Sequence, residues 1–197
     1  GLSEVGSISL TQDANEIGNI IPHMQALTAV NPNSVAIPVT RVNGVTTVLS
    51  VPVGGRFPGT AALINLVGYT PDQMYAGFKA VVMNFPNAGR RGWRDRRTDE
   101  EREKDKEKAL KEVTEVWEKA ELYARIKASD GELEHNPAME AMVPVVTGGA
   151  PLLIEVNEEK DIRAAIEWVQ EQEVNAIFTG VAEGWRVAEE LAEAGIP

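Results

Sequence analysis

Residues 151–179 read PLLIEVNEEKDIRAAIEWVQEQEVNAIFT, and this stretch decides the fold. The runs 151–156 and 175–179 are short, apolar and rich in branched side chains, which is typical of strands buried on both faces. Between them, apolar residues recur at helical spacing behind an asparagine suited to capping a helix: Asn157, then Ile162, Ile166 and Val169. The order strand, helix, strand predicts a parallel pair joined by a crossover helix.

The same alternation extends in both directions. A predicted helix over 34–44 leads into a β-branched strand over 45–51. After 175–179, a predicted helix covers 181–194, with Val187, Ala188 and Leu191 directed inward and Gly195 ending it. Strands that alternate with amphipathic helices predict an α/β protein with a parallel sheet covered on both faces.

The segment 54–96 interrupts this pattern and is interpreted as an insertion between consecutive strand–helix units. It opens with a glycine- and proline-rich loop, and its runs 61–66 and 79–84 predict two antiparallel strands. Thr70 followed by Pro71 is a typical short helix start.

A long charged helix is predicted over about 98–130. Thr98 and Glu101 have the spacing of a capping box, and Gly131 is suited to end the helix. Apolar residues recur later in the helix at steps of three and four, beginning at Leu110 and including Trp117. The first three turns are polar all round, so we expect them to project into solvent.

Composition narrows the functional class. The formal net charge is −11, which disfavours general binding to nucleic acid, and no apolar run approaches a membrane span. One basic cluster, Arg90, Arg91, Arg94, Arg96 and Arg97 around Trp93, fits either an anion site or a solvated loop. Cysteine is absent, which excludes disulfides and thiolate chemistry, and a cytoplasmic location is the default expectation.

Several stretches together resemble a known enzyme family. In order, they are Asp13-Ala14-Asn15-Glu16, Ile21-Pro22-His23, Gly44-Val45-Thr46-Thr47-Val48, Pro151-Leu152-Leu153-Ile154 and Gly180-Val181-Ala182-Glu183-Gly184-Trp185. Their order and spacing are similar to the first half of the imidazolonepropionase-like branch of the amidohydrolase superfamily. The resemblance covers nearly the whole chain, as a single domain over 1–197.

The resemblance implies part of a TIM barrel with its active site at the carboxyl ends of the strands. Such enzymes hydrolyse amide or cyclic amide C–N bonds with divalent metal, zinc being the favoured ion, which activates water and polarises the carbonyl. Their first strand ends in a His-x-His pair, and this chain is expected to start just after it. We therefore expect a truncated hydrolase fragment, inactive alone, with no catalytic residue and no bound metal.

Glu155 is the one metal-ligand candidate. It interrupts an apolar strand, where a partly desolvated carboxylate needs a cation or a donor. In some relatives a glutamate on this strand binds the metal, and the alternative is a structural glutamate bonded to an amide or arginine. His23 and His135 lie 112 positions apart in predicted loops and are not expected to bind metal.

Four residues are candidates for contacts with a small amide-type substrate: Asp13, Asn15, Glu183 and Trp185. Alternatively, Glu183 is a helix first-turn residue, Trp185 packs in the core, and Asp13 and Asn15 form a turn. No nucleic-acid or membrane partner is expected.

Two other classes of function remain open beside the hydrolase. One is a non-catalytic binding or assembly module, and the other is a complete small α/β domain that binds a sugar or nucleotide. Because a partial barrel has open sheet edges with unpaired backbone groups, a homo-oligomer formed through those edges is predicted.

Overall fold

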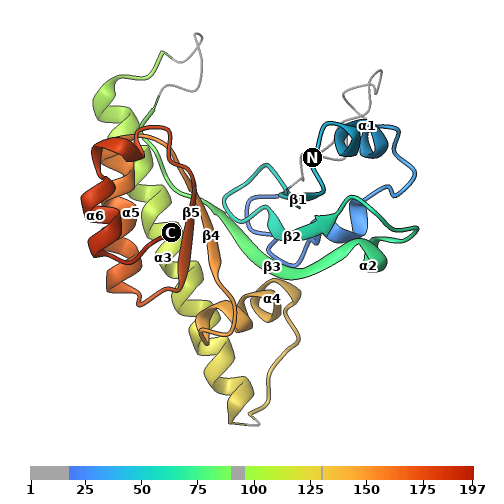
Figure 1. Cartoon of the computed structure of the whole chain (residues 1–197). Helices are drawn as coiled ribbons and strands as arrows, with labels where there is room; N and C mark the ends of the chain where they lie inside the picture. Colours follow the sequence, from blue (N-terminus) through green and yellow to red (C-terminus); the bar gives the residue numbers. More distant parts are fainter. Residues whose placement is uncertain (1–17, 90–95, 130) are drawn as a thin grey trace. The chain divides into compact units, whose positions relative to one another are not determined.

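A computed structural model of the chain describes residues 18–89, 96–129 and 131–197 (Figure 1). It is a mixed α/β structure, and its contacts divide the chain into two compact units, Gly1–Val82 and Met83–Pro197. The strand order in its five-stranded sheet is β1-β2-β3-β4-β5, and β3 (Tyr75–Asn84) includes the boundary between the units. None of the helices in the described ranges combines the length and the apolar character that a membrane span requires.

The strands of the first unit form an antiparallel meander. β1 (Thr47–Ser50) pairs with β2 (Gly59–Asn65), and β2 pairs with β3. The antiparallel pairing of β2 with β3 was predicted from the sequence. The expectation that 45–51 forms a strand of a parallel sheet was wrong. A parallel connection needs a crossover of about a dozen residues or more. The loop between β1 and β2 is shorter, so the chain returns beside β1 in the opposite direction.

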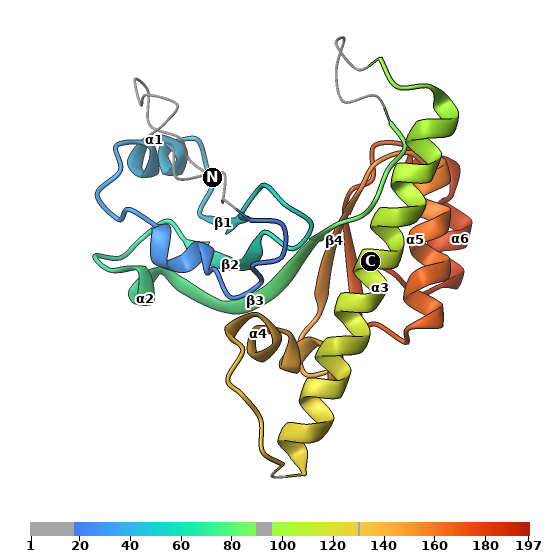
Figure 2. The same cartoon turned by 180° about the vertical axis from the view of Figure 1, so that it is seen from behind.

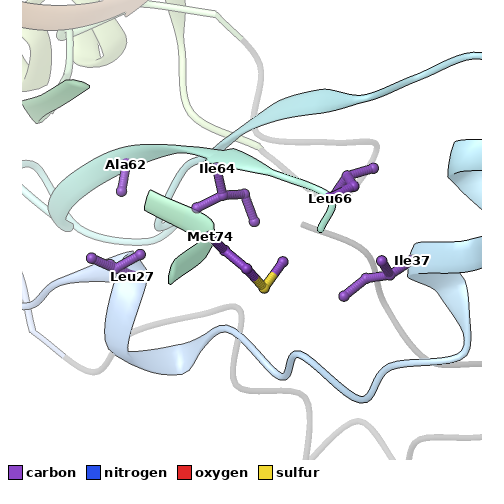
Figure 3. Packing of buried hydrophobic residues seen from close by; sticks show 6 residues of the cluster. All are labelled: Leu27, Ile37, Ala62, Ile64, Leu66 and Met74. Carbon is purple, nitrogen blue, oxygen red and sulfur yellow. The ribbon is translucent and has the colours of Figure 1, made fainter. Parts of the chain in front are cut away.

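The core of the first unit is built by three short helices against β2. They are η2 (Ala26–Ala29), α1 (Ala36–Val42) and α2 (Pro71–Met74). Six buried side chains form its cluster: Leu27, Ile37, Ala62, Ile64, Leu66 and Met74 (Figure 3). Each helix thus contributes one buried apolar side chain, which orients it on the sheet.

The second unit contains the predicted parallel pair. β4 (Leu152–Val156) lies in register with β5 (Ala176–Gly180), so that Leu152 is beside Ala176 and Val156 beside Gly180. The crossover helix α5 (Glu159–Glu171) and the helix α3 (Asp99–Ala128) cover one side of this pair (Figures 1 and 2). The parallel pair and its crossover helix were therefore correctly predicted.

Helix α3 begins with a complete capping box. The Glu101 N–H donates to Thr98 Oγ1 at 3.2 Å, and the Thr98 N–H donates to Glu101 Oε2 at 2.8 Å. Further along, Trp117 meets Trp168 of α5 edge to face, with ring centroids 5.6 Å apart. The indole N–H of Trp168 donates to Thr114 Oγ1, so the apolar stripe of α3 packs on α5.

Most side chains in the first turns of α3 are exposed, as expected, but two of them also reach α5. Lys106 Nζ lies 2.6 Å from Asp161 Oδ1, and the Asp161 side chain is only 1% exposed. Glu103 reaches Lys160 at 3.4 Å in the same region. At this end of α3 the contacts with α5 are ion pairs, which hydrophobic periodicity cannot detect.

Helix α4 (Pro137–Val146) was not predicted, although its start carries a sequence signal. Asn136 Oδ1 accepts from the N–H groups of Ala138 and Met139, and Pro137 occupies the first turn. The Tyr123 hydroxyl donates to Glu140 Oε2 at 3.1 Å and joins α4 to α3. Hydrogen bonding from Lys127, with a further bond from Tyr123, lowers the pKa of Glu140 below its ordinary value.

The predicted helix over 181–194 is divided in two. A 3-10 turn, η3 (Gly184–Arg186), precedes α6 (Ala188–Glu193). Val187 is buried as expected, but Ala188 is exposed, because the break at Gly184 changes the phase of the helix.

After α6 the chain returns to the sheet. The Phe178 N–H of β5 donates to the Pro197 carbonyl at 3.0 Å. Pro197 therefore lies in hydrogen-bonding distance of β5, where a neighbouring strand would lie.

Candidate functional site at the carboxyl ends of β4 and β5

The candidate site lies where β4 and β5 end. Glu155 and Thr179 are register partners in the parallel pair, so their side chains share one face of the sheet. Ile154 and Val156, on either side of Glu155, are buried. The Glu155 side chain itself is exposed, so the prediction that it is partly desolvated was wrong. It is presented to solvent on a rigid strand, as a ligand or a contact residue must be.

The backbone near Glu155 is fixed by its neighbours. The Glu155 carbonyl accepts from the Phe85 N–H at 3.0 Å, just beyond β3. The Thr179 hydroxyl donates to the Ile154 carbonyl at 3.4 Å. These contacts keep the ends of β4 and β5 in register.

The loops that follow the two strands are joined to each other. The Val181 N–H donates to the Val156 carbonyl at 2.7 Å, and the Glu183 N–H donates to the Asn157 carbonyl at 2.9 Å. A Cβ atom at Gly180 would lie 2.5 Å from Asn157 Oδ1, and Gly180 has a φ of 81°. Only glycine therefore fits at position 180 without displacing the Asn157 side chain.

Val181 has an unusual backbone conformation. Its φ is 40°, in the left-handed region that β-branched residues strongly disfavour. Such a conformation costs on the order of 1–3 kcal/mol, and similar outliers concentrate at functional sites. The strain at Val181, directly after β5, agrees with a functional site at this end of the sheet, although Glu173 also has a positive φ, of 51°. No feature of the sequence indicates this backbone strain.

Glu183 accepts a hydrogen bond at the start of a different helix from the one expected. Its Oε2 accepts from the Glu159 N–H at 2.8 Å, at the amino end of α5. The N-cap residue of α5 is Glu158, with no side-chain capping bond, so the prediction that Asn157 caps this helix was wrong. The Glu183 carboxylate thus caps α5 from the neighbouring loop and interacts favourably with the helix dipole.

An ion-pair network surrounds this cap. The Glu159 carboxylate accepts from Arg163 Nη1 at 2.5 Å and from Arg186 Nη1 at 3.2 Å. These two bonds lower the pKa of Glu159 below its ordinary value, and the bond from Arg163 has the larger effect. Arg163 also donates to Glu190, and its bonds to Glu190 and, to a smaller extent, Glu159 raise the pKa of the Arg163 guanidinium. Sequence reasoning did not identify this network, since Arg186 and Glu190 lie 27 residues from their partners.

Trp185 is exposed, with 74% of its surface accessible. The alternative that it packs in the core was wrong, because the turn η3 directs it outward. The Arg186 guanidinium lies 4.9 Å from the centroid of its ring, a cation–π contact. Trp185 therefore offers a flat apolar surface beside a positive charge.

The other sequence-based candidates lie elsewhere. Asp13 and Asn15 are outside the described residues, as are Arg90, Arg91 and Arg94 of the basic cluster. Arg97 pairs with Asp105 at 2.6 Å, which fits the interpretation of a solvated loop. His23 and His135 are both exposed. Among the residues that the structure describes, no three His, Asp or Glu side chains are grouped to hold a metal ion.

No family model and no curated protein matches the sequence. A search of solved structures finds an amidohydrolase from Thermotoga maritima MSB8, with 24% sequence identity and a TM-score of 0.75. The match covers 98% of this chain and 52% of that one, so the chain spans about half the length of the solved structure. At this identity the likeness concerns the fold.

Proposed function

From the amidohydrolase-like fold, we propose that this chain is part of a metal-dependent hydrolase of the imidazolonepropionase-like branch, acting on amide or cyclic amide C–N bonds. The observation that carries the proposal is the structural likeness over 98% of the chain, at a TM-score of 0.75. A second support is local: an exposed carboxylate, Glu155, and a strained residue, Val181, both lie where two parallel strands end.

The described residues alone do not fit a complete metal centre. A catalytic zinc site needs three protein ligands, and the described ranges contain no group of three suitable side chains. Glu155 is the proposed ligand that this chain contributes to a site completed by other residues. Divalent metal would activate water in such a site. No catalytic step is assigned to this chain, which is proposed to be inactive alone.

The residues of this chain are proposed to position a substrate. Trp185, exposed and beside Arg186, suits the flat face of a small cyclic amide. The bond of Glu183 to the amino end of α5 fixes the loop that carries Trp185. Direct contact of Glu183, Asp13 or Asn15 with the substrate stays a prediction.

The test uses the complete product of the encoding gene, whatever its ends. We expect a His-x-His pair encoded directly before Gly1, and metal-dependent hydrolysis of a panel of cyclic and acyclic amides. Glu155→Gln should lower kcat by about tenfold or more if a metal ligand is lost. Glu173→Gln, at an exposed position beyond α5, is the matched control and should retain activity. A reading frame that begins at residue 1 and ends at residue 197 would contradict the proposal, as would a full-length product inert toward every amide.

A non-catalytic assembly module is the second candidate. It is favoured by the exposed valines of the first unit, since contiguous exposed apolar residues mark contact surfaces. In that case the gene product would bind a partner with the same affinity before and after metal removal.

A further inference from the structure

Asn43 and Gly44 lie in the link between α1 and β1, and both residues are exposed. Asparagine followed by glycine is the pair most prone to spontaneous deamidation, because glycine has no side chain to hinder attack by its backbone nitrogen. No other asparagine of the chain precedes a glycine. A Cβ atom built on Gly44 would meet nothing within 4 Å, so the space around it is open. Chemistry and surroundings thus single out one asparagine.

The hydrogen bonds of Asn43 and Gly44 end helix α1. Asn43 is the C-cap residue, and its side-chain Nδ2 donates to the Val39 carbonyl at 2.8 Å. The Gly44 N–H donates to the Arg41 carbonyl at 3.0 Å. Gly44 has a φ of 88°, a conformation typical of the glycine that follows a helix. Both nitrogen atoms that take part in deamidation are therefore hydrogen-bonded while the helix end is closed.

Helix α1 is short, and its last residues are in solvent. It has seven residues, among them Pro38, which lacks an N–H. Ile37 attaches it to the core cluster (Figure 3), and Arg41 donates to the Leu66 carbonyl at 3.2 Å. Residues 42–44, beyond these attachments, are all exposed. Helices this short are marginal on their own and their ends open locally, which frees the Gly44 nitrogen.

We propose that Asn43 is a site of spontaneous deamidation, at a rate controlled by opening of the α1 C-cap. In the opened state the Gly44 nitrogen loses its proton and attacks Cγ of Asn43. The N–Cγ bond forms, the Cγ–Nδ2 bond breaks, and ammonia leaves with that proton, so that a succinimide ring remains. Water then opens the ring at either carbonyl and gives aspartate or isoaspartate. The attack is intramolecular between adjoining residues, which favours it over reaction with a separate nucleophile.

The product cannot restore the cap. A carboxylate has no hydrogen to donate to the Val39 carbonyl, and its charge repels that oxygen. A negative charge at the carboxyl end of a helix also opposes the helix dipole. Isoaspartate, in addition, routes the main chain through the side chain and lengthens the link between α1 and β1. Deamidation at Asn43 therefore loosens the end of α1, and this does not depend on the proposed hydrolytic function.

The first experiment incubates the folded chain at about 37 °C and pH 8 and follows it by tryptic peptide mapping. Trypsin cleaves after Arg41 and Arg56, so the peptide 42–56 contains Asn43 as its only side-chain amide. That peptide should gain about 1 Da, and about tenfold faster than Asn175, which is exposed but precedes alanine. In guanidinium chloride the rate at Asn43 should rise, because the cap is then open. Equal rates at the two asparagines, or no rise on unfolding, overturn the proposal.

The second experiment measures amide hydrogen exchange in two variants of the full chain. Asn43→Asp places the carboxylate of the product at the C-cap and should speed exchange in α1 by about tenfold, with α5 unchanged. Asn33→Asp is the matched control, because it adds the same charge at an exposed asparagine before the amino end of α1. The helix dipole favours a negative charge there, so exchange should not increase. Faster exchange in both variants, or in neither, contradicts the loss of the cap.

Discussion

Lys106 of α3 and Asp161 of α5 form a buried ion pair, with Nζ 2.6 Å from Oδ1. The Asp161 side chain is 1% exposed and that of Lys106 14% exposed. The second carboxylate oxygen of Asp161, Oδ2, is buried without a hydrogen bond among the described residues. The charge of Asp161 is therefore compensated mainly by Lys106.

Lys106→Met should lower the free energy of unfolding by about 3 kcal/mol, because it leaves a buried carboxylate without its cation. Adding Asp161→Asn should recover part of this loss. Urea unfolding followed by tryptophan fluorescence measures both variants. Lys160→Met is the control, since Lys160 is half-exposed in its pairs and should cost less than about 1 kcal/mol. Equal losses in the two single variants would contradict the assignment.

Val181→Gly should raise the free energy of unfolding by about 0.5–1 kcal/mol, because glycine adopts a positive φ without strain. Glu173→Gly is the companion variant: Glu173 has a φ of 51° just after α5, far along the chain from the loop of Trp185. Thermal unfolding should show a gain in both. A loss in Val181→Gly would mean that the contacts of the valine side chain outweigh its backbone strain.

Glu183→Ala should destabilise the second unit by about 1 kcal/mol, the usual effect of losing a helix cap. Glu183→Gln keeps an acceptor oxygen and should lose less. Glu167→Ala, at an exposed position on the same helix, is expected to change stability by no more than about 0.5 kcal/mol. If Glu183 served only a substrate, urea midpoints without ligand would be the same for all three variants.

The lowered pKa of Glu159 predicts acid sensitivity. Its folded-state pKa lies below the unfolded value, so its stabilising contribution is present above the unfolded pKa of about 4.3. That contribution is lost as pH falls through the lower folded-state pKa. Glu159→Gln should therefore lose less stability than the parent chain on acidification from neutral pH. Urea midpoints over about pH 7 to 3 test this. A parallel pH profile for the two chains would refute the role of the Arg163 and Arg186 contacts.

The parallel pair of strands was predictable because its signals are local. The apolar runs 151–156 and 175–179 flank a helix with a clear periodic stripe, and the structure has β4, α5 and β5 there. Thr98 and Glu101 likewise lie within one turn, so their mutual capping could be inferred from spacing alone.

The antiparallel pairing of β1 was not predictable from its own composition. A β-branched strand fits a parallel or an antiparallel neighbour equally well, and the choice depends on the length of the following connection. The helix break at Gly184 has a similar cause. The hydrogen bonds of Val181 and Glu183 to Val156 and Asn157 determine the path of the loop, and these partners are distant in sequence.

The position of the candidate site at the ends of the strands followed from the order of elements, but its contacts did not. Glu155 could be located on a strand, whereas its exposure depends on what covers that face of the sheet. The capping of α5 by Glu183 joins residues 24 positions apart. Spacing rules for helix caps consider only the adjoining residues, so they selected Asn157 instead.

The bond from Phe178 to Pro197 has a practical consequence for anyone who attaches a reporter or an affinity tag to this chain. Residues added after Pro197 would begin alongside β5, next to the bond between Phe178 and Pro197. A linker of valine and threonine would favour pairing with β5, because these residues favour strands. A linker of glycine and proline would disfavour that pairing. The first few linker residues therefore determine whether the linker pairs with β5 as an added strand or extends away from the sheet.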